Sequence, residues 1–156
     1  MTQQGTQAAG YVYNWHELTD VVTTQASANN LADGTFVYQD GTNGITTVPI
    51  SSIPEAGRIR FLPVGVDNSG GSTGDYDVET VKTGAIVVCT CDGAITVGDR
   101  VVASGTTAGR CAARAATSAN LEEVIGTYLG HTGELEGTGN DPSNAADGEL
   151  IVVQLI

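Results

Sequence analysis

One stretch in the middle of the chain, residues 82–102, constrains the fold most strongly. Its first part, Ala85 to Cys91, is a short apolar run rich in β-branched side chains, which suits a buried strand better than a helix. Asp92-Gly93 follows, a turn dipeptide whose glycine takes a positive φ without steric strain. A second turn at residues 97–99 leads into Arg100 to Ala103. We therefore predict a strand, a tight turn and a second strand, arranged as a hairpin.

Short strand-like runs lie on both sides of this stretch. Phe36 to Gln39 and Ile45 to Val48 flank a five-residue loop with glycine at both its second and last positions, which predicts another hairpin. Arg58 to Leu62 alternates, with Ile59 and Phe61 expected inside.

The second half of the chain adds three more expected strands. They are a weak one at 110–116, a clear one at 123–130 and a closing one at 150–156. Gly126 and Gly130 allow a bulge or a close approach of another strand. Charged residues make up 15% of the chain, against a usual level of about 25%, and there are 21 glycines. The expected fold is all-β: a small β-barrel or sandwich of short antiparallel strands.

The first 35 residues differ from the rest. We expect 1–35 to be an N-terminal arm or extension and 36–156 a β domain, with 82–156 sufficient for a small barrel. Residues 1–10 have little to bury and are expected to be disordered, and 17–25 to form a short, weak helix. One helical turn is expected within 115–123.

Three aromatic residues, Tyr11, Tyr13 and Trp15, lie within five positions of each other. They fit either a strand that covers one end of the core or an anchor inserted into another subunit.

The net charge of −12, from 18 acidic and 6 basic residues, restricts the partners. Nucleic acids and anionic membranes attract clustered lysine and arginine, and no such cluster is visible in the sequence, so we expect neither partner. The negative charge favours either solubility or binding to a partner with a basic surface. No apolar run reaches the length of roughly 18 residues that a membrane span needs, and no secretion signal is visible at the N-terminus.

Two patterns raise the question of a metal. Cys89 and Cys91 share one face of a strand, a poor geometry for a disulfide, and we expect buried, reduced thiols without zinc. Acidic residues alternate at the end of segment 67–79, as at the start of a calcium loop, but Thr80 stands where an EF-hand needs glycine. We expect a solvated acidic loop, with calcium binding as the alternative, and no cofactor.

No catalytic motif is recognisable. The only histidines are His16 and His131, no serine lies in a nucleophile elbow, and phosphate-binding glycine motifs are missing from the sequence. We expect a protein that is not an enzyme.

Residues 82–156 resemble the capsid cement (decoration) proteins of tailed bacteriophages. The resemblance is carried by Thr83-Gly-Ala-Ile-Val-Val, Gly93-Ala-Ile-Thr-Val-Gly-Asp-Arg-Val, Glu123-Val-Ile-Gly-Thr and Gly148-Glu-Leu-Ile-Val-Val-Gln-Leu. It implies a homotrimer on the outer surface of a virion, made in the host cytoplasm, that binds the major capsid protein and stabilises the head. It implies no catalytic residues. The alternatives are a tail or fibre module that binds a cell-surface glycan, which needs exposed aromatics over a groove, and a small cytosolic enzyme.

The closing strand and the aromatic segment are where such contacts are expected. Leu150, Val152 and Ile156 share one face of the closing strand, and the opposite face is equally apolar. One face fills the barrel, and the other is covered either by residues 16–66 or by a neighbouring subunit. Since the resemblance implies a three-fold ring, Leu150, Val152 and Ile156 are the candidate subunit interface. Tyr11, Tyr13 and Trp15 are the candidate capsid-contact arm.

Overall fold

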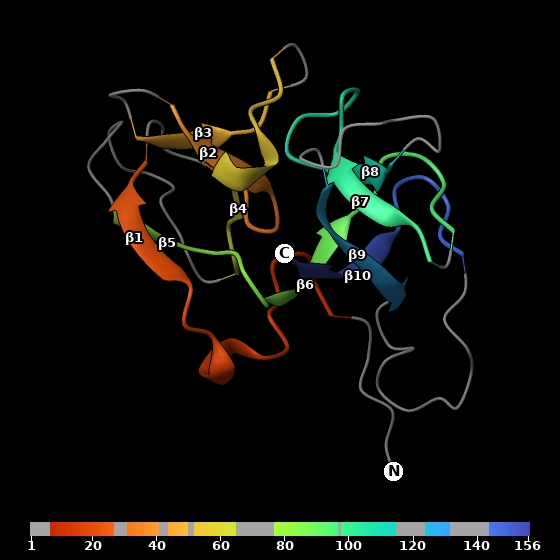
Figure 1. The fold of residues 1–156 in the computed structure, drawn as a ribbon, viewed down its shortest axis with the longest axis horizontal. Coiled ribbons are helices and arrows are strands. Elements are labelled where there is room, and N and C mark those ends of the chain that lie inside the picture. The colour runs from red at the N-terminus through yellow and green to blue at the C-terminus, as the bar shows by residue number, and fades with distance from the viewer. Residues whose placement is uncertain are drawn as a thin grey trace.

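The regular secondary structure of the described residues is almost entirely β-strand, arranged in two sheets. The computed structural model describes residues 7–26, 31–40, 44–49, 52–64, 77–96, 98–114, 124–131 and 144–156. Within these residues lie two five-stranded antiparallel sheets and two single 3-10 turns (Figure 1). The predicted all-β class is confirmed, and the two layers pack in a sandwich-like arrangement.

The first sheet takes most of its strands from the first half of the chain. Its order is β1 (Val21–Gln25), β5 (Asp77–Val81), β4 (Ile59–Phe61), β2 (Phe36–Gln39) and β3 (Ile45–Thr47). The hairpin predicted around residue 42 is confirmed, because β2 and β3 pair antiparallel. Ile59 and Phe61 are buried as expected, with Arg60 between them only partly covered.

Two predictions in this half are wrong. The weak helix expected at 17–25 is instead a 3-10 turn, η1 (Trp15–Glu17), followed by β1. Valine and threonine dominate β1, and their β-branched side chains favour the extended backbone. Asp77 and Glu79 lie within β5, not in an acidic loop, because β1 pairs with them along its whole length. Residues 67–76 lie outside the described residues.

The second sheet is formed entirely by residues 86–155. Its order is β6 (Ile86–Thr90), β10 (Leu150–Leu155), β9 (Val124–His131), β7 (Arg100–Ala103) and β8 (Cys111–Ala113). Each strand predicted after residue 82 is present. The helical turn expected within 115–123 lies outside the described residues.

The prediction of a hairpin within residues 82–102, however, is wrong. β6 pairs with the closing strand β10, and β7 pairs with β8 and β9. Gly93 and Gly98 do adopt positive φ angles, of 85° and 92°, but neither turn closes a hairpin between β6 and β7. Between them Ile95 forms a bridge with Ala145, which leads the chain across the end of the sheet.

Both sheets curl back on themselves. A parallel bridge between Ala26 and Ile45 joins the two outer edges of the first sheet, and one between Cys91 and Cys111 does so in the second. The expected bulges in β9 are also present. The pairing register shifts beside Gly126, against β7, and beside Gly130, against β10.

The main hydrophobic core joins the two sheets. It combines first-sheet residues such as Phe36, Phe61 and Val81 with second-sheet residues such as Val87 and Val153. A smaller cluster on the other side of the first sheet is formed by Ala26, Val37, Ile45, Leu62 and Val78. One core shared by the two sheets favours a single cooperative unit.

The first 26 residues contribute to both sheets, because the segment before β1 pairs with the second sheet and β1 itself with the first. Val12 forms an antiparallel bridge with Val87 and is buried in the main core. Backbone hydrogen bonds from Gly10 N to Val88 O (2.8 Å) and from Tyr13 N to Ile86 O (2.9 Å) attach it to the outer edge of β6. The predicted extension therefore supplies an edge segment to one sheet and β1 to the other. Residues 1–6 lie outside the described residues.

Candidate interaction surfaces

The chain crosses between the sheets twice, and polar side chains tie the two crossings together. Residues 82–85 link β5 to β6, and residues 14–20 link the edge segment to β1. Asn14 Nδ2 donates to the carbonyl of Gly84 (2.8 Å), and its Oδ1 accepts from the N–H of Ile86 (2.9 Å). These bonds fix the start of the second sheet against the N-terminal segment.

Asp20 forms the second tie. Its carboxylate accepts a hydrogen bond from the N–H of Thr83 (3.0 Å) and pairs with the guanidinium of Arg60 (2.9 Å). Partial burial opposes ionisation of Asp20, but the Thr83 N–H and Arg60 outweigh it and hold the pKa of the carboxyl below its usual value. Arg60 also donates to the hydroxyl of Thr80 (2.7 Å), so the ion pair is held in one geometry.

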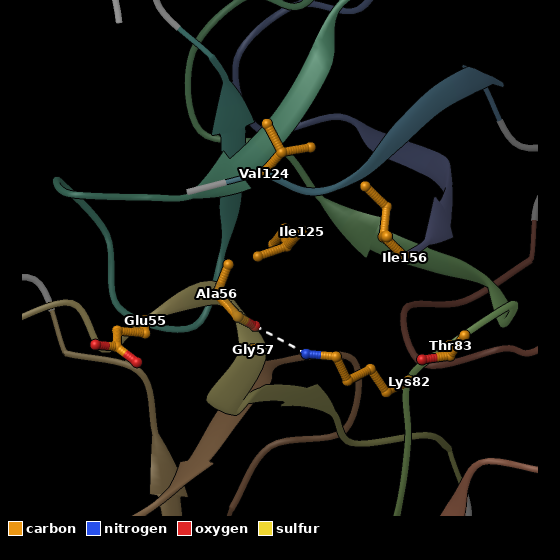
Figure 2. Close-up of a pocket in the computed structure, with 8 residues that line it drawn as sticks. All are labelled: Glu55, Ala56, Gly57, Lys82, Thr83, Val124, Ile125 and Ile156. Atoms are coloured by element: carbon orange, nitrogen blue, oxygen red, sulfur yellow. Dashed lines mark hydrogen bonds between the residues drawn. The ribbon is translucent and has the colours of Figure 1, made fainter. Parts of the chain in front are cut away.

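A cleft of about 660 Å³ lies beside this junction, between the sheets (Figure 2). One wall is η2 (Ala56–Arg58) with Glu55, the other is the start of β9 with Ile156, and residues 82–83 lie at one end. The lining is mainly apolar, with Val124, Ile125 and Ile156 facing the space. An apolar cleft with a few polar groups is the usual form of a binding site for another molecule.

Lys82 is the cation that lines this cleft. Its ammonium donates to the carbonyls of Ala56 (2.8 Å) and Ile59 (3.2 Å). Burial and the nearby Arg60 charge lower the pKa of Lys82, and Asp20 partly offsets them. The hydrogen bonds to two carbonyls hold η2 against the link between the sheets.

A second, smaller hollow of about 200 Å³ is formed where the N-terminal segment leaves the second sheet. It is lined by Tyr11 and Trp15 from the N-terminal segment and by Pro63 and Val64 from the segment after β4. Val64 exposes 52% of its surface, a large value for an aliphatic residue. Tyr13 packs edge-on against Tyr11, with ring centroids 5.0 Å apart. Two of the three predicted capsid-contact residues therefore line this aromatic hollow, and the third supports it.

The closing strand, unlike the aromatic segment, lies in the interior of a sheet. β10 lies between β6 and β9, and Val152 and Val88, opposite each other, are both fully buried within one chain. Leu150 is half-buried, whereas Ile156 exposes 59% of its surface and lines the cleft. Of the candidate subunit interface, only Ile156 is well exposed, and Val152 needs no second subunit to cover it.

The three cysteines form a buried cluster inside the second sheet. The Sγ atoms of Cys89 and Cys111 lie 3.4 Å apart, and Cys91 Sγ donates to the carbonyl of Ala146 (3.0 Å). The hydrogen bond with Cys111 and full burial raise the pKa of Cys89, and burial raises that of Cys91. The expectation of buried free thiols is confirmed, although the partner of Cys89 is Cys111 rather than Cys91.

The placement of three arginines on or beside β7 and β8 was not anticipated from the sequence. Arg100 and Arg114 lie at one end of this two-stranded hairpin and Arg110 at the other, because Val101 pairs with Ala113. The turn at 104–109 together with the alternation of the flanking strands contained this signal. The three arginines are separated by 10 and 4 positions along the chain, so they do not form a run of basic residues that the sequence would show directly.

Comparisons with known proteins give few matches. No protein-family model and no curated protein matches the chain. Among solved structures, the chain is similar to the N base of the head fiber gp8.5 of bacteriophage phi29, at 18% identity and a TM-score of 0.46, over 87% of this chain and 92% of that one. Among the described residues, no helix is both long and apolar enough to cross a membrane.

Proposed function

We propose that this protein is a structural protein of a tailed-bacteriophage virion, a cement or decoration protein that binds the outside of the capsid. One observation carries the proposal. The four stretches that resemble cement proteins overlap β6, β7, β9 and β10, which are four of the five strands of a single sheet. A resemblance scattered over the chain would fall on both sheets, whereas this one falls on one of them.

The aromatic hollow is the proposed capsid contact. Tyr11 and Trp15 present large, rigid apolar surfaces beside the exposed Val64, and such aromatics are preferred anchors at protein interfaces. The partner is the major capsid protein, and the protein acts as a homotrimer without enzymatic activity. It is made in the host cytoplasm and carried on the virion exterior, and it binds neither nucleic acid nor membrane.

The test uses capsids with and without the protein. Capsids that lack it should release their DNA at a lower temperature, and adding the purified protein should restore the resistance. Trp15→Ala should weaken capsid binding by about tenfold or more, as expected for an interface anchor. Val22→Ala, which truncates an exposed apolar residue on β1 outside the hollow, is the control and should bind normally, and circular dichroism shows whether Trp15→Ala, which also removes a contact with the core, remains folded. Equal heat resistance with and without the protein would refute the cement function.

A glycan-binding tail or fibre module is the second candidate, and the same hollow favours it. Sugar rings stack on exposed aromatic side chains, and Tyr11 and Trp15 both line the hollow. A glycan array distinguishes the two functions. Binding to a defined glycan that Trp15→Ala abolishes, together with no binding to capsids, would favour the module.

A further inference from the structure

We propose that Cys89 and Cys111 form a redox site, whose two thiols join in a disulfide under oxidising conditions. The bond closes the seam of the second sheet, which is the place where its outer edges meet. The oxidant is a low-molecular-weight disulfide such as oxidised glutathione. The inference goes beyond the proposed function, because it concerns the chemistry of this chain alone and holds whatever the chain binds.

The two thiols are already neighbours. The Sγ atoms of Cys89 and Cys111 lie 3.4 Å apart, and both side chains are fully buried. A disulfide bond is about 2.0 Å long, so the sulfur atoms must approach by roughly a further 1.4 Å. The two backbone segments are held side by side as well, because Cys91, two positions after Cys89, forms a parallel bridge with Cys111.

The third cysteine is directed elsewhere. Cys91 Sγ donates a hydrogen bond to the carbonyl of Ala146 (3.0 Å). Cys111 Sγ contacts Cys89 and also the carbonyl of Thr90 (3.6 Å). The sulfur contact therefore selects Cys89–Cys111 from the three possible pairs and leaves Cys91 as a free thiol.

The bond would join the two ends of the strand order. β6 and β8 are the outer strands of the second sheet, and the bridge between Cys91 and Cys111 joins their edges. Beside this bridge, Asp92 N donates to the carbonyl of Cys111 (2.7 Å). A cross-link between Cys89 and Cys111, 22 positions apart, removes conformations from the unfolded chain and so stabilises the closed sheet.

The reaction consists of two thiol–disulfide exchanges. One cysteine thiolate attacks a sulfur of oxidised glutathione, which forms a mixed disulfide and releases one glutathione. The other cysteine thiolate attacks the protein sulfur of that mixed disulfide, which forms the Cys89–Cys111 bond and releases the second glutathione. The two cysteine thiols thus lose two electrons and two protons, and oxidised glutathione takes them up to become two thiols.

The folded, reduced protein reacts slowly by this route. The hydrogen bond with Cys111 and full burial raise the pKa of Cys89, so little thiolate forms, and no reagent reaches it directly. The exchange therefore takes place while the chain folds or when the seam opens.

Oxidative refolding of the full chain tests the inference. The denatured, reduced protein is refolded in a mixture of oxidised and reduced glutathione, with refolding in excess reductant as the reference. Peptide mapping by mass spectrometry should find one disulfide per chain, between Cys89 and Cys111, with Cys91 free. The oxidised protein should have a urea midpoint roughly 1–2 M above that of the reduced protein.

Alanine substitutions at two cysteines give a matched pair of variants. Cys91→Ala removes a buried thiol that lies outside the proposed pair, so it should keep both the bond and the shift in midpoint. Cys89→Ala removes one partner, so it should form no disulfide within the chain and show no shift. Each variant is compared with its own reduced form, which cancels the cost of losing a core side chain. Should a variant fail to fold, the wild-type peptide map decides the pairing by itself.

Three results would overturn the redox site. They are free thiols or glutathione adducts only after oxidative refolding, a main product whose disulfide includes Cys91, and a midpoint that stays the same or falls on oxidation. These measurements involve no capsid, so failure of the redox site is distinguishable from failure of the proposed function.

Discussion

At the scale of single residues, Gly126 marks a close approach between β9 and β10. A Cβ atom on this glycine would lie 2.5 Å from Cγ1 of Val153 and 2.7 Å from the carbonyl oxygen of Gln154. Neither neighbour moves easily, because Val153 is fully buried and the carbonyl belongs to β10, which has a hydrogen-bonded strand on each side. Gly126→Ala should therefore destabilise the protein by about 1–3 kcal/mol, the usual effect of overpacking. Urea unfolding measures this.

Gly57 provides the control for that substitution. A Cβ there meets nothing within 4 Å, and the residue lies in the exposed turn η2. Gly57→Ala should leave stability unchanged or raise it by up to about 1 kcal/mol, because alanine has less conformational entropy to lose than glycine when the chain folds. Equal losses for the two variants would show that the close approach at Gly126 does not exist.

Asp20 gives stability a defined dependence on pH. Its pKa is lowered in the folded protein, so it contributes stability at pH values above the unfolded pKa of about 3.9. That contribution disappears as the pH falls through the lower, folded pKa. Asp20→Asn should lose less than about 1 kcal/mol at pH 7, because the pair is partly exposed. The difference from wild type should shrink toward zero in urea titrations below pH 4, and a constant difference would contradict the ionic role.

The cysteines should behave as inert core residues. Since burial and the Cys111 contact raise the pKa of Cys89, little thiolate forms at neutral pH. A thiol reagent at pH 8 should label none of the three within minutes in the native protein and all three in denaturant. Metal analysis belongs to the same test, and about one zinc per chain would contradict the expected absence of metal.

At the scale of elements, the sequence predicted strands better than their partners. Alternation and β-branching located β2, β4, β9 and β10 because these signals are local. The pairing of β6 with β10 instead joins residues about sixty positions apart along the chain, and no local pattern shows which distant strand will be the partner. For the same reason the contacts of Asn14 and Asp20, and the placement of the arginines of the β7–β8 hairpin, could not be located before the register was known.

The N-terminal edge segment is the element whose removal is most informative. Residues 10–14 cover the edge of β6, contribute Val12 to the core and tie the sheets through Asn14. Deleting residues 1–6 should leave stability unchanged, whereas deleting 1–14 should lower it by roughly 2–5 kcal/mol through the loss of a core side chain and its hydrogen bonds. Urea unfolding of the two truncations checks this. Equal stability would mean that the segment is a dispensable arm, as the sequence suggested.

At the scale of the whole molecule, the shared core predicts that the two sheets unfold together. Phe36 and Phe61 from the first sheet pack in the same cluster as Cys89 and Val153 from the second, and neither sheet keeps this core without the other. The only tryptophan, Trp15, packs against that cluster, so its fluorescence reports on the junction. Burial of Cys89 reports on the second sheet. In urea, loss of tryptophan burial and gain of thiol reactivity should share one midpoint, as expected for a single cooperative unit.

A substitution confined to the first sheet sharpens this prediction. Phe61→Ala removes a fully buried ring that packs against Phe36, with centroids 5.2 Å apart, and should cost about 3–5 kcal/mol. If the core is shared, the thiol-reactivity midpoint of the second sheet must fall together with the tryptophan midpoint. If the thiols keep their wild-type midpoint while tryptophan burial is lost earlier, the second sheet folds alone. In that case the segment that resembles cement proteins, residues 82–156, is an independent domain to which the first sheet is attached.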